Sequence, residues 1–162
     1  MVVVKRFRAA WGIEPSPGYE NYKTWFPELK KQGYSGIEIN LHIIDNPNVF
    51  KQLCKENDLE INILIFSAWP RYQGPRPRCT VADHLAAYRD QLTRAKVFDP
   101  LKINAQSGSD IFSYDESVEF FQGTLEIDAA LGMIGKVCHE THRNRSLFNP
   151  YAAEYILKRV PG

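Results

Sequence analysis

The chain has 162 residues, of which 44% are hydrophobic and 24% charged, as expected for one soluble globular domain with a core of its own. Its 20 basic and 19 acidic residues leave a formal charge of +1, which excludes the strongly basic balance typical of nucleic-acid and membrane-surface binding. Three widely spaced cysteines, Cys54, Cys79 and Cys138, form no CxxC pair, so we expect a reduced, cytoplasmic protein without a disulfide framework. No stretch has the length and apolarity of a membrane span or a signal peptide, and we expect no membrane partner.

The first half of the chain alternates between strand and helix patterns. A β-branched run predicts a strand over Val2–Trp11, and apolar residues at three- and four-residue spacing predict a helix over Tyr19–Gln32. A second short strand is predicted over Gly36–Leu41, and Asn46-Pro47 opens a helix that continues through Cys54. The nearly continuous apolar run Leu59–Phe66 is typical of a strand that is buried on both faces.

The second half continues the alternation. After a proline- and arginine-rich loop over Arg71–Arg78, Thr80 is predicted to cap a helix that runs to about Val97. Leu101–Ala105 is predicted as the fourth strand and Tyr114–Leu131 as the fourth helix. The apolar stretch over residues 131–135 is predicted as a buried fifth strand, and a last helix opens at Asn149-Pro150.

Five strand–helix pairs in strict alternation predict an α/β protein with one parallel sheet. Two architectures match this pattern. One is a flavodoxin-like doubly wound sheet, although no strand is followed by a Walker loop or a GxGxxG turn. The other is a partial (βα)8 barrel.

Chemically versatile side chains gather after the predicted fifth strand, in the stretch Lys136–Arg145. Ligands of parallel α/β folds bind at the carboxyl ends of strands, so this stretch is the first candidate for a site. His139 and Glu140 are adjacent and therefore face opposite sides of a strand, whereas Glu140 and His142 share a side if the strand continues that far. From the residues alone, an ion pair between Glu140 and Arg143 or Arg145 on a loop is the favoured interpretation.

The string His139-Glu-Thr-His-Arg-Asn-Arg145 resembles the fifth strand of the xylose isomerase-like TIM barrels, which include sugar phosphate isomerases/epimerases and AP endonucleases. Gly36–Ile39 is similar to the second strand of that superfamily, and Lys102–Asp110 to the fourth. The resemblance implies that residues 1–162 form one domain containing the first five units of a partial TIM barrel. It also implies that Glu140 binds a divalent cation (Mg²⁺, Mn²⁺ or Zn²⁺) and transfers a proton between adjacent carbons of a keto-sugar or polyol.

His142 is the expected partner of Glu140, as a metal ligand or a catalytic neighbour. The resemblance places Glu38 and His42, after the second strand, in the wall of a carbohydrate pocket. Trp11 and Trp69 lie near predicted strand ends and could pack against a sugar ring, although such aromatic residues more often belong to the core. Further candidate substrate-binding residues are Gln106, Arg143 and Arg145; the arginines, with Arg71, Arg76 and Arg78, could also form a phosphate-binding rim or a solvated basic loop.

Barrels of this superfamily have eight strands and take further metal ligands from strands six to eight, whereas this sequence ends after the fifth helix. We therefore expect a homodimer joined through the open sheet edges, with ligands contributed across the interface. The alternative is a non-catalytic barrel derivative that binds a partner or itself. We expect no nucleic-acid partner, because the charge is balanced and four histidines are too few for the AP endonuclease branch.

Overall fold

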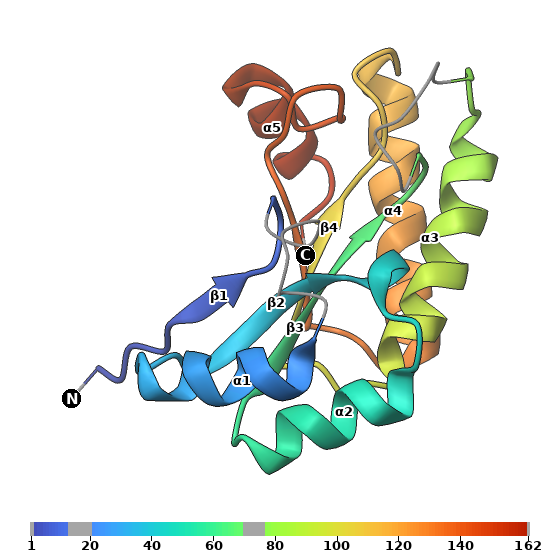
Figure 1. The fold of residues 1–162 in the computed structure, drawn as a ribbon. Helices are drawn as coiled ribbons and strands as arrows, with labels where there is room; N and C mark the ends of the chain where they lie inside the picture. Colours follow the sequence, from blue (N-terminus) through green and yellow to red (C-terminus); the bar gives the residue numbers. More distant parts are fainter. Residues whose placement is uncertain (1, 13–20, 70–76, 162) are drawn as a thin grey trace.

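The computed structural model describes residues 2–12, 21–69 and 77–161, where strands and helices alternate (Figure 1). The strands are β1 (Phe7–Ala9), β2 (Gly36–Asn40), β3 (Glu60–Phe66), β4 (Lys102–Gln106) and β5 (Val137–His139). The helices are α1 (Tyr22–Lys31), α2 (Pro47–Glu56), α3 (Val81–Lys96), α4 (Tyr114–Leu131) and α5 (Pro150–Leu157), and a 3₁₀ turn η1 (Leu41–Ile43) follows β2.

The five strands form one sheet in the order β1-β2-β3-β4-β5, and every neighbouring pair is parallel. This order confirms the predicted alternation and parallel sheet. A flavodoxin-like sheet has the order 2-1-3-4-5, so that alternative is wrong. Each unit here is added beside the one before it, as in a barrel, which leaves β1 and β5 as the two edges of the described sheet.

One face of the sheet, called here the helix face, is covered by helices and is apolar. Its isoleucines are almost completely buried: Ile37, Ile39, Ile61, Ile63, Ile65 and Ile103. They form one cluster with buried residues from four helices, including Phe26 of α1, Phe50 of α2, Tyr88 of α3 and Ile127 of α4. Burying one such side chain stabilises the fold by about 1.5–3 kcal/mol, so this face supplies the main driving force for folding.

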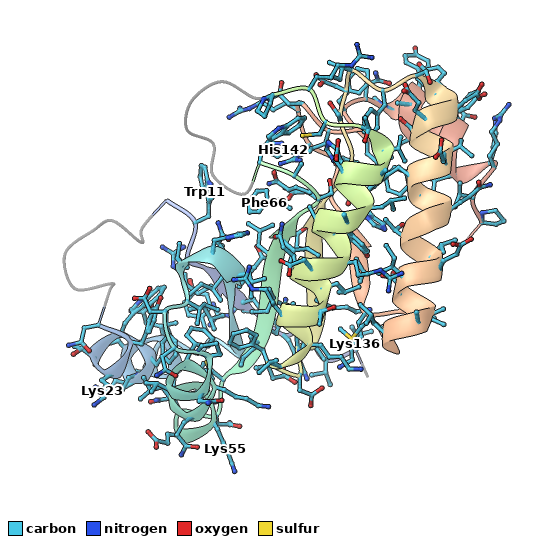
Figure 2. All side chains as sticks on the ribbon, turned by 90° about the vertical axis from the view of Figure 1, so that its right-hand side faces the viewer. Trp11, Lys23, Lys55, Phe66, Lys136 and His142 are labelled. Carbon is cyan, nitrogen blue, oxygen red and sulfur yellow. The ribbon has the colours of Figure 1, made fainter. Side chains whose placement is uncertain are left out.

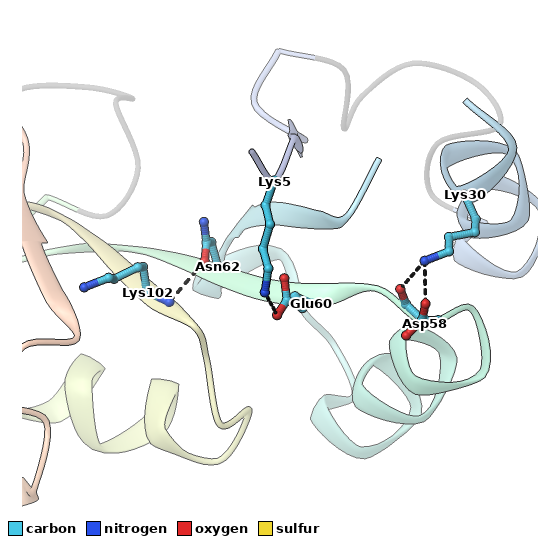
Figure 3. Close-up of polar contacts among 6 residues, drawn as sticks. All are labelled: Lys5, Lys30, Asp58, Glu60, Asn62 and Lys102. Carbon is cyan, nitrogen blue, oxygen red and sulfur yellow. Dashed lines mark hydrogen bonds and ion pairs between the residues drawn. The ribbon is translucent and has the colours of Figure 1, made fainter. Parts of the chain in front are cut away.

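The opposite face, called here the open face, is mostly polar. Paired residues of parallel strands share a face, and the register places Glu38 beside Asn62 and carries Asn104 and Gln106 onto the same side. At the amino-terminal end of the strands, Lys5 forms an ion pair with Glu60 (2.6 Å), and the Lys102 backbone N–H donates to Asn62 Oδ1 (3.1 Å; Figure 3). Complete barrels normally fill this side with branched apolar residues. The open face instead offers hydrogen-bonding groups.

Two edge strands differ from the sequence predictions. β1 contains three residues, and Val2–Val4 lie outside the sheet. The fifth strand is not the apolar stretch over residues 131–135, because Leu131 is the last residue of α4 and Gly132 ends that helix in the left-handed conformation (φ 66°). The chain then turns and begins β5 at Val137, so the predicted position of this strand was wrong.

The helix termini follow their local sequences closely. Thr80 caps α3 as predicted, and Asp83 completes a capping box by accepting a hydrogen bond from the Thr80 backbone N–H (2.8 Å). Ser113 and Glu116 form the same motif at the start of α4. Across the described ranges, no helix combines the length and the apolarity needed to cross a bilayer.

Candidate active site

Two carboxylates on the open face, one from β2 and one that follows β5, lie close enough for the charge of one to act on the other. Glu38 lies on β2, and Glu140 follows β5, where its backbone N–H still donates to the Ala105 carbonyl of β4 (2.9 Å). Gln106 Nε2 donates to Glu140 Oε2 (3.2 Å), and the Asn104 side chain hydrogen-bonds to Glu38. Gln106, the last residue of β4, thus holds Glu140 at the carboxyl end of that strand, whereas Asn104 contacts Glu38 from the middle of β4.

Glu38 has an unusual proton affinity. Burial raises its pKa above the ordinary value for glutamate, the negative charge of Glu140 raises it further, and the hydrogen bond from Asn104 opposes the shift. A carboxyl group that keeps its proton to a higher pH is better matched to proton transfer near neutrality. The raised pKa of Glu38 therefore favours an acid–base role for the two glutamates over an ion pair between Glu140 and an arginine.

His139 lies on the other side of the sheet. Its Nδ1 is 2.6 Å from Ser107 Oγ, and its ring packs against those of Tyr88 (centroids 6.1 Å apart) and Phe121 (4.9 Å apart). Burial lowers the pKa of His139 to about 4, so the ring is neutral at pH 7. It links the helix face of the sheet to α3 and α4 and takes no part in the carboxylate pair.

A second serine–histidine pair, which is fully buried, joins β3 to α3 and was not predicted from the sequence. Ser67 Oγ is 2.8 Å from Nδ1 of the fully buried His84, and Ser67 also accepts a hydrogen bond from the Gly108 N–H (2.8 Å). Burial lowers the pKa of His84 to about 4, and the charge of Arg145 contributes. The available signal was a serine directly after each of the two central strands and a histidine on the buried side of a predicted helix.

Arg145 is buried, which contradicts both interpretations of this residue as a surface arginine. Its side chain is 1% exposed, and Nη1 donates to the carbonyl of Ala68 (3.1 Å) and less closely to that of Gly108 (3.5 Å). Its guanidinium group lies over the rings of Phe66 (5.6 Å) and Trp69 (5.4 Å). Arg145 therefore binds the chain where it leaves β3 and β4, and it cannot belong to an exposed phosphate rim.

His142 does not share a strand face with Glu140, because β5 ends at His139 and the chain then leaves the sheet. The His142 Nδ1 atom instead lies 2.7 Å from the Arg143 carbonyl oxygen, and Arg143 is exposed. The longer strand that would place His142 on the same face as Glu140 is therefore absent, and the role of His142 as partner of Glu140 stays a prediction.

The aromatic candidates lie at the same end of the molecule as the site. Figure 2 shows Trp11, Phe66 and His142 toward one end and Lys136 toward the other. Trp11 is 76% exposed after β1. Trp69 is less available, because its Nε1 donates to the Pro77 carbonyl (3.1 Å) and its ring meets that of His84 edge-on.

The remaining candidates can be placed only in part. His42 is half-buried in η1, and its backbone N–H donates to Asn40 Oδ1 (2.9 Å), which turns the chain away from the end of β2. Arg78 is exposed before α3. Arg71 and Arg76 lie outside the described residues.

The carboxylate pair alone does not make a complete metal site. Among residues 2–12, 21–69 and 77–161, no group of three or more His, Cys, Asp or Glu side chains is placed to hold a metal ion. Glu38 and Glu140 offer oxygen ligands of the kind that Mg²⁺ and Mn²⁺ prefer, but such ions take about six ligands. The donors present therefore fit a hard cation in type and fall short in number.

No family model matches the sequence, and no curated protein matches it. Solved structures do match. AP endonuclease family 2 from Brucella melitensis superposes with a TM-score of 0.68 at 18% identity, over 98% of this chain and 65% of that one. D-psicose 3-epimerase from Clostridium cellulolyticum superposes with a TM-score of 0.66 at 18% identity, over 98% of this chain and 60% of that one. A sugar phosphate isomerase/epimerase from Parabacteroides distasonis superposes with a TM-score of 0.65 at 14% identity, over 99% of this chain and 63% of that one.

The chain has the fold of a partial TIM barrel. The structural likeness confirms the resemblance stated from the sequence at the level of the fold, since identities of 14–18% carry no more than that. This partial barrel spans about 60 to 65% of the length of the chains it matches.

Proposed function

We propose that this partial barrel carries one wall of a carbohydrate isomerase or epimerase site, centred on Glu38 and Glu140. The observation that supports the proposal is the approach of these two carboxylates on the open face, with the pKa of Glu38 raised by burial and by Glu140. Several structural neighbours are named as epimerases or isomerases of sugars, among them D-psicose 3-epimerase and 3-keto-D-glucoside 4-epimerase.

The proposed reaction moves a proton between adjacent carbons of a keto-sugar or polyol. One carboxylate removes a proton from the carbon beside the carbonyl, and the proton returns to the neighbouring carbon or to the opposite side of the same carbon. Glu38 is suited to hold the proton between the two steps, and Gln106 orients Glu140. A divalent cation bound by both carboxylates would polarise the carbonyl oxygen.

A carbohydrate matches the open face better than DNA does. Amide side chains such as those of Asn62 and Asn104 both donate and accept hydrogen bonds, as sugar hydroxyls do. The net charge of +1 provides little attraction for a phosphate backbone.

Calorimetric titration with Mn²⁺ tests whether Glu38 and Glu140 bind a divalent cation. We expect binding heat for the wild type, none for Glu140→Gln and a weaker signal for Glu38→Gln. Glu126→Gln changes an exposed residue of α4 and serves as the matched control. Absence of heat in the wild type, or heat unchanged by Glu140→Gln, would contradict a metal site here.

Proton exchange tests the chemistry independently of the metal. In D₂O, an enzyme of this kind incorporates deuterium at the carbon beside the carbonyl of a ketohexose such as D-fructose, which NMR detects. We expect incorporation with the wild type and at least a hundredfold slower incorporation with Glu140→Gln, the usual scale for loss of an acid–base group. Equal rates for both proteins would refute the assignment.

A second candidate function is binding without catalysis. The supporting observation is an apolar groove of about 580 Å³ between α4, β5 and α5, lined by residues such as Leu125, Ile134 and Leu157. Fluorescence of an apolar dye should rise on binding there and fall in Leu157→Glu, while Val97→Glu, an exposed position at the end of α3, should leave it unchanged. No difference between these variants would remove the groove as a binding site.

A further inference from the structure

The sheet has two parallel edges that differ in sequence and could join one another. β1 pairs with β2 alone and β5 with β4 alone within the described sheet. We propose that two copies of this chain associate head to tail, with β1 of each copy pairing in parallel with β5 of the other. This association closes the two sheets into one ring, and it does not depend on the proposed catalytic function.

Exposed apolar residues precede both edge strands. Before β1, Val2, Val3 and Val4 are 89%, 74% and 79% exposed, and they precede Phe7 by three to five residues. Before β5, Ile134 is 75% exposed and precedes Val137 by three residues. Parallel pairing of β1 with β5 brings these segments alongside each other, so each covers apolar surface of the other.

The faces of the two strands determine the register. Arg8 is paired with Ile37 and therefore faces the helices, while Ala9 is paired with Glu38 and faces the open side. On β5, Cys138 is paired with Asn104 and faces the open side. Placing Arg8 beside Val137 and Ala9 beside Cys138 keeps both faces continuous across the new pair.

The charges on the helix face are complementary in this register. Asp128 of α4 lines the apolar groove beside β5 and accepts a hydrogen bond from the Tyr88 hydroxyl (2.7 Å). Arg8 has no hydrogen bond or ion pair within the part of the chain that the structure describes. In the proposed pair, Arg8 of one copy points toward the groove that Asp128 of the other copy lines.

If the two copies are related by a twofold axis along the strands, β1 and β5 of each copy both find a partner strand in the other copy. A contact between two different surfaces forms a closed ring when the rotation returns to its start, and two copies are enough here. Both open faces then line one enclosed space, so each Glu38–Glu140 pair faces surface contributed by the second copy.

Disulfide cross-linking tests the register directly. Neighbouring strands are about 4.8 Å apart, within the range of about 4.4–6.8 Å that a disulfide spans between Cα atoms. In a Cys79→Ser background, Ala9→Cys should form a covalent dimer through the native Cys138 under mild oxidation. Arg8→Cys, one residue away on the opposite face, should cross-link much less, and adding Cys138→Ser to the Ala9→Cys protein should abolish the product.

Light scattering at micromolar concentration tests the association itself. We expect twice the single-chain mass for the wild type and a dissociation constant raised at least tenfold in Ile134→Asp, since an interface that buries this side chain depends on it. Val49→Asp, at an exposed position of α2, should dimerise normally. A single-chain mass for the wild type would overturn the proposal.

Discussion

Acid should destabilise this fold through its two serine–histidine pairs, of which Ser67–His84 is buried and Ser107–His139 partly buried. His84 and His139 both have a pKa lowered to about 4 by burial, against about 6.5 in an unfolded chain. The folded state therefore binds fewer protons than the unfolded state between these values, and the stability contributed by each neutral ring is complete above pH 6.5 and lost as the pH falls toward 4. Linkage gives a loss of about 2 kcal/mol for each histidine between pH 7 and pH 5, hence about 4 kcal/mol for the two. That is a large fraction of the roughly 5–15 kcal/mol that holds a typical domain folded.

Urea denaturation at a series of pH values measures this loss. His139→Gln and His84→Gln lower stability at every pH, because each removes a hydrogen bond with serine, but each should also flatten the dependence between pH 7 and pH 5 by about 2 kcal/mol. Glu38 and Asp128 have raised pKa values and act in the opposite direction, and comparing a variant with the wild type cancels their effect. His142→Gln is the control. A wild-type protein equally stable at pH 7 and pH 5, with parallel curves for both variants, would refute the reasoning.

Three further outcomes follow from the described contacts, each measured by urea denaturation at pH 7. Gly132→Ala should lower the free energy of unfolding by about 1 kcal/mol, since Gly132 has φ +66° and lies in open space. Gly108→Ala, at the same φ, should lower it clearly more, because the new methyl group meets the buried Ser146. Equal losses for the two variants would contradict the close packing around Gly108. Arg145→Met should cost about 1–3 kcal/mol for each carbonyl left without its donor, and a neutral result would show that the buried guanidinium is not needed there. Tyr88→Phe should cost about 1–3 kcal/mol by leaving Asp128 without the phenol donor, and adding Asp128→Asn should recover part of that loss.

The repeating pattern of the chain was sufficient to predict the five units and their parallel sheet. Residues such as Ile37 and Ile63 lie in short β-branched runs, and their burial on the helix face follows from that pattern. The fifth strand could not be placed in this way. Leu131 and Met133 have the same composition as a buried strand, yet the left-handed glycine between them ends a helix, and composition alone does not separate the two cases.

Only those parts of the candidate site that depend on the alternation of side chains along a strand were predictable. Glu38 and Glu140 occupy alternating positions that point to the open side, and the resemblance to known barrels singled them out. The environment of Arg145 was not predictable, because it depends on carbonyl groups and aromatic rings far away in the sequence. The position of His142 depended on one further pair of residues in β5, and sequence patterns do not determine strand ends that closely.

The separation of the two sheet faces has a consequence for how this scaffold can be altered. Isoleucines and helices on one side form the apolar cluster, and Asn62, Asn104 and Gln106 on the other side lie outside it. Substitutions on the polar side can therefore change what the surface recognises without opening a cavity in the apolar core. Variant libraries confined to that side should retain a high proportion of folded members, which makes the surface a practical starting point for selecting new ligand specificities.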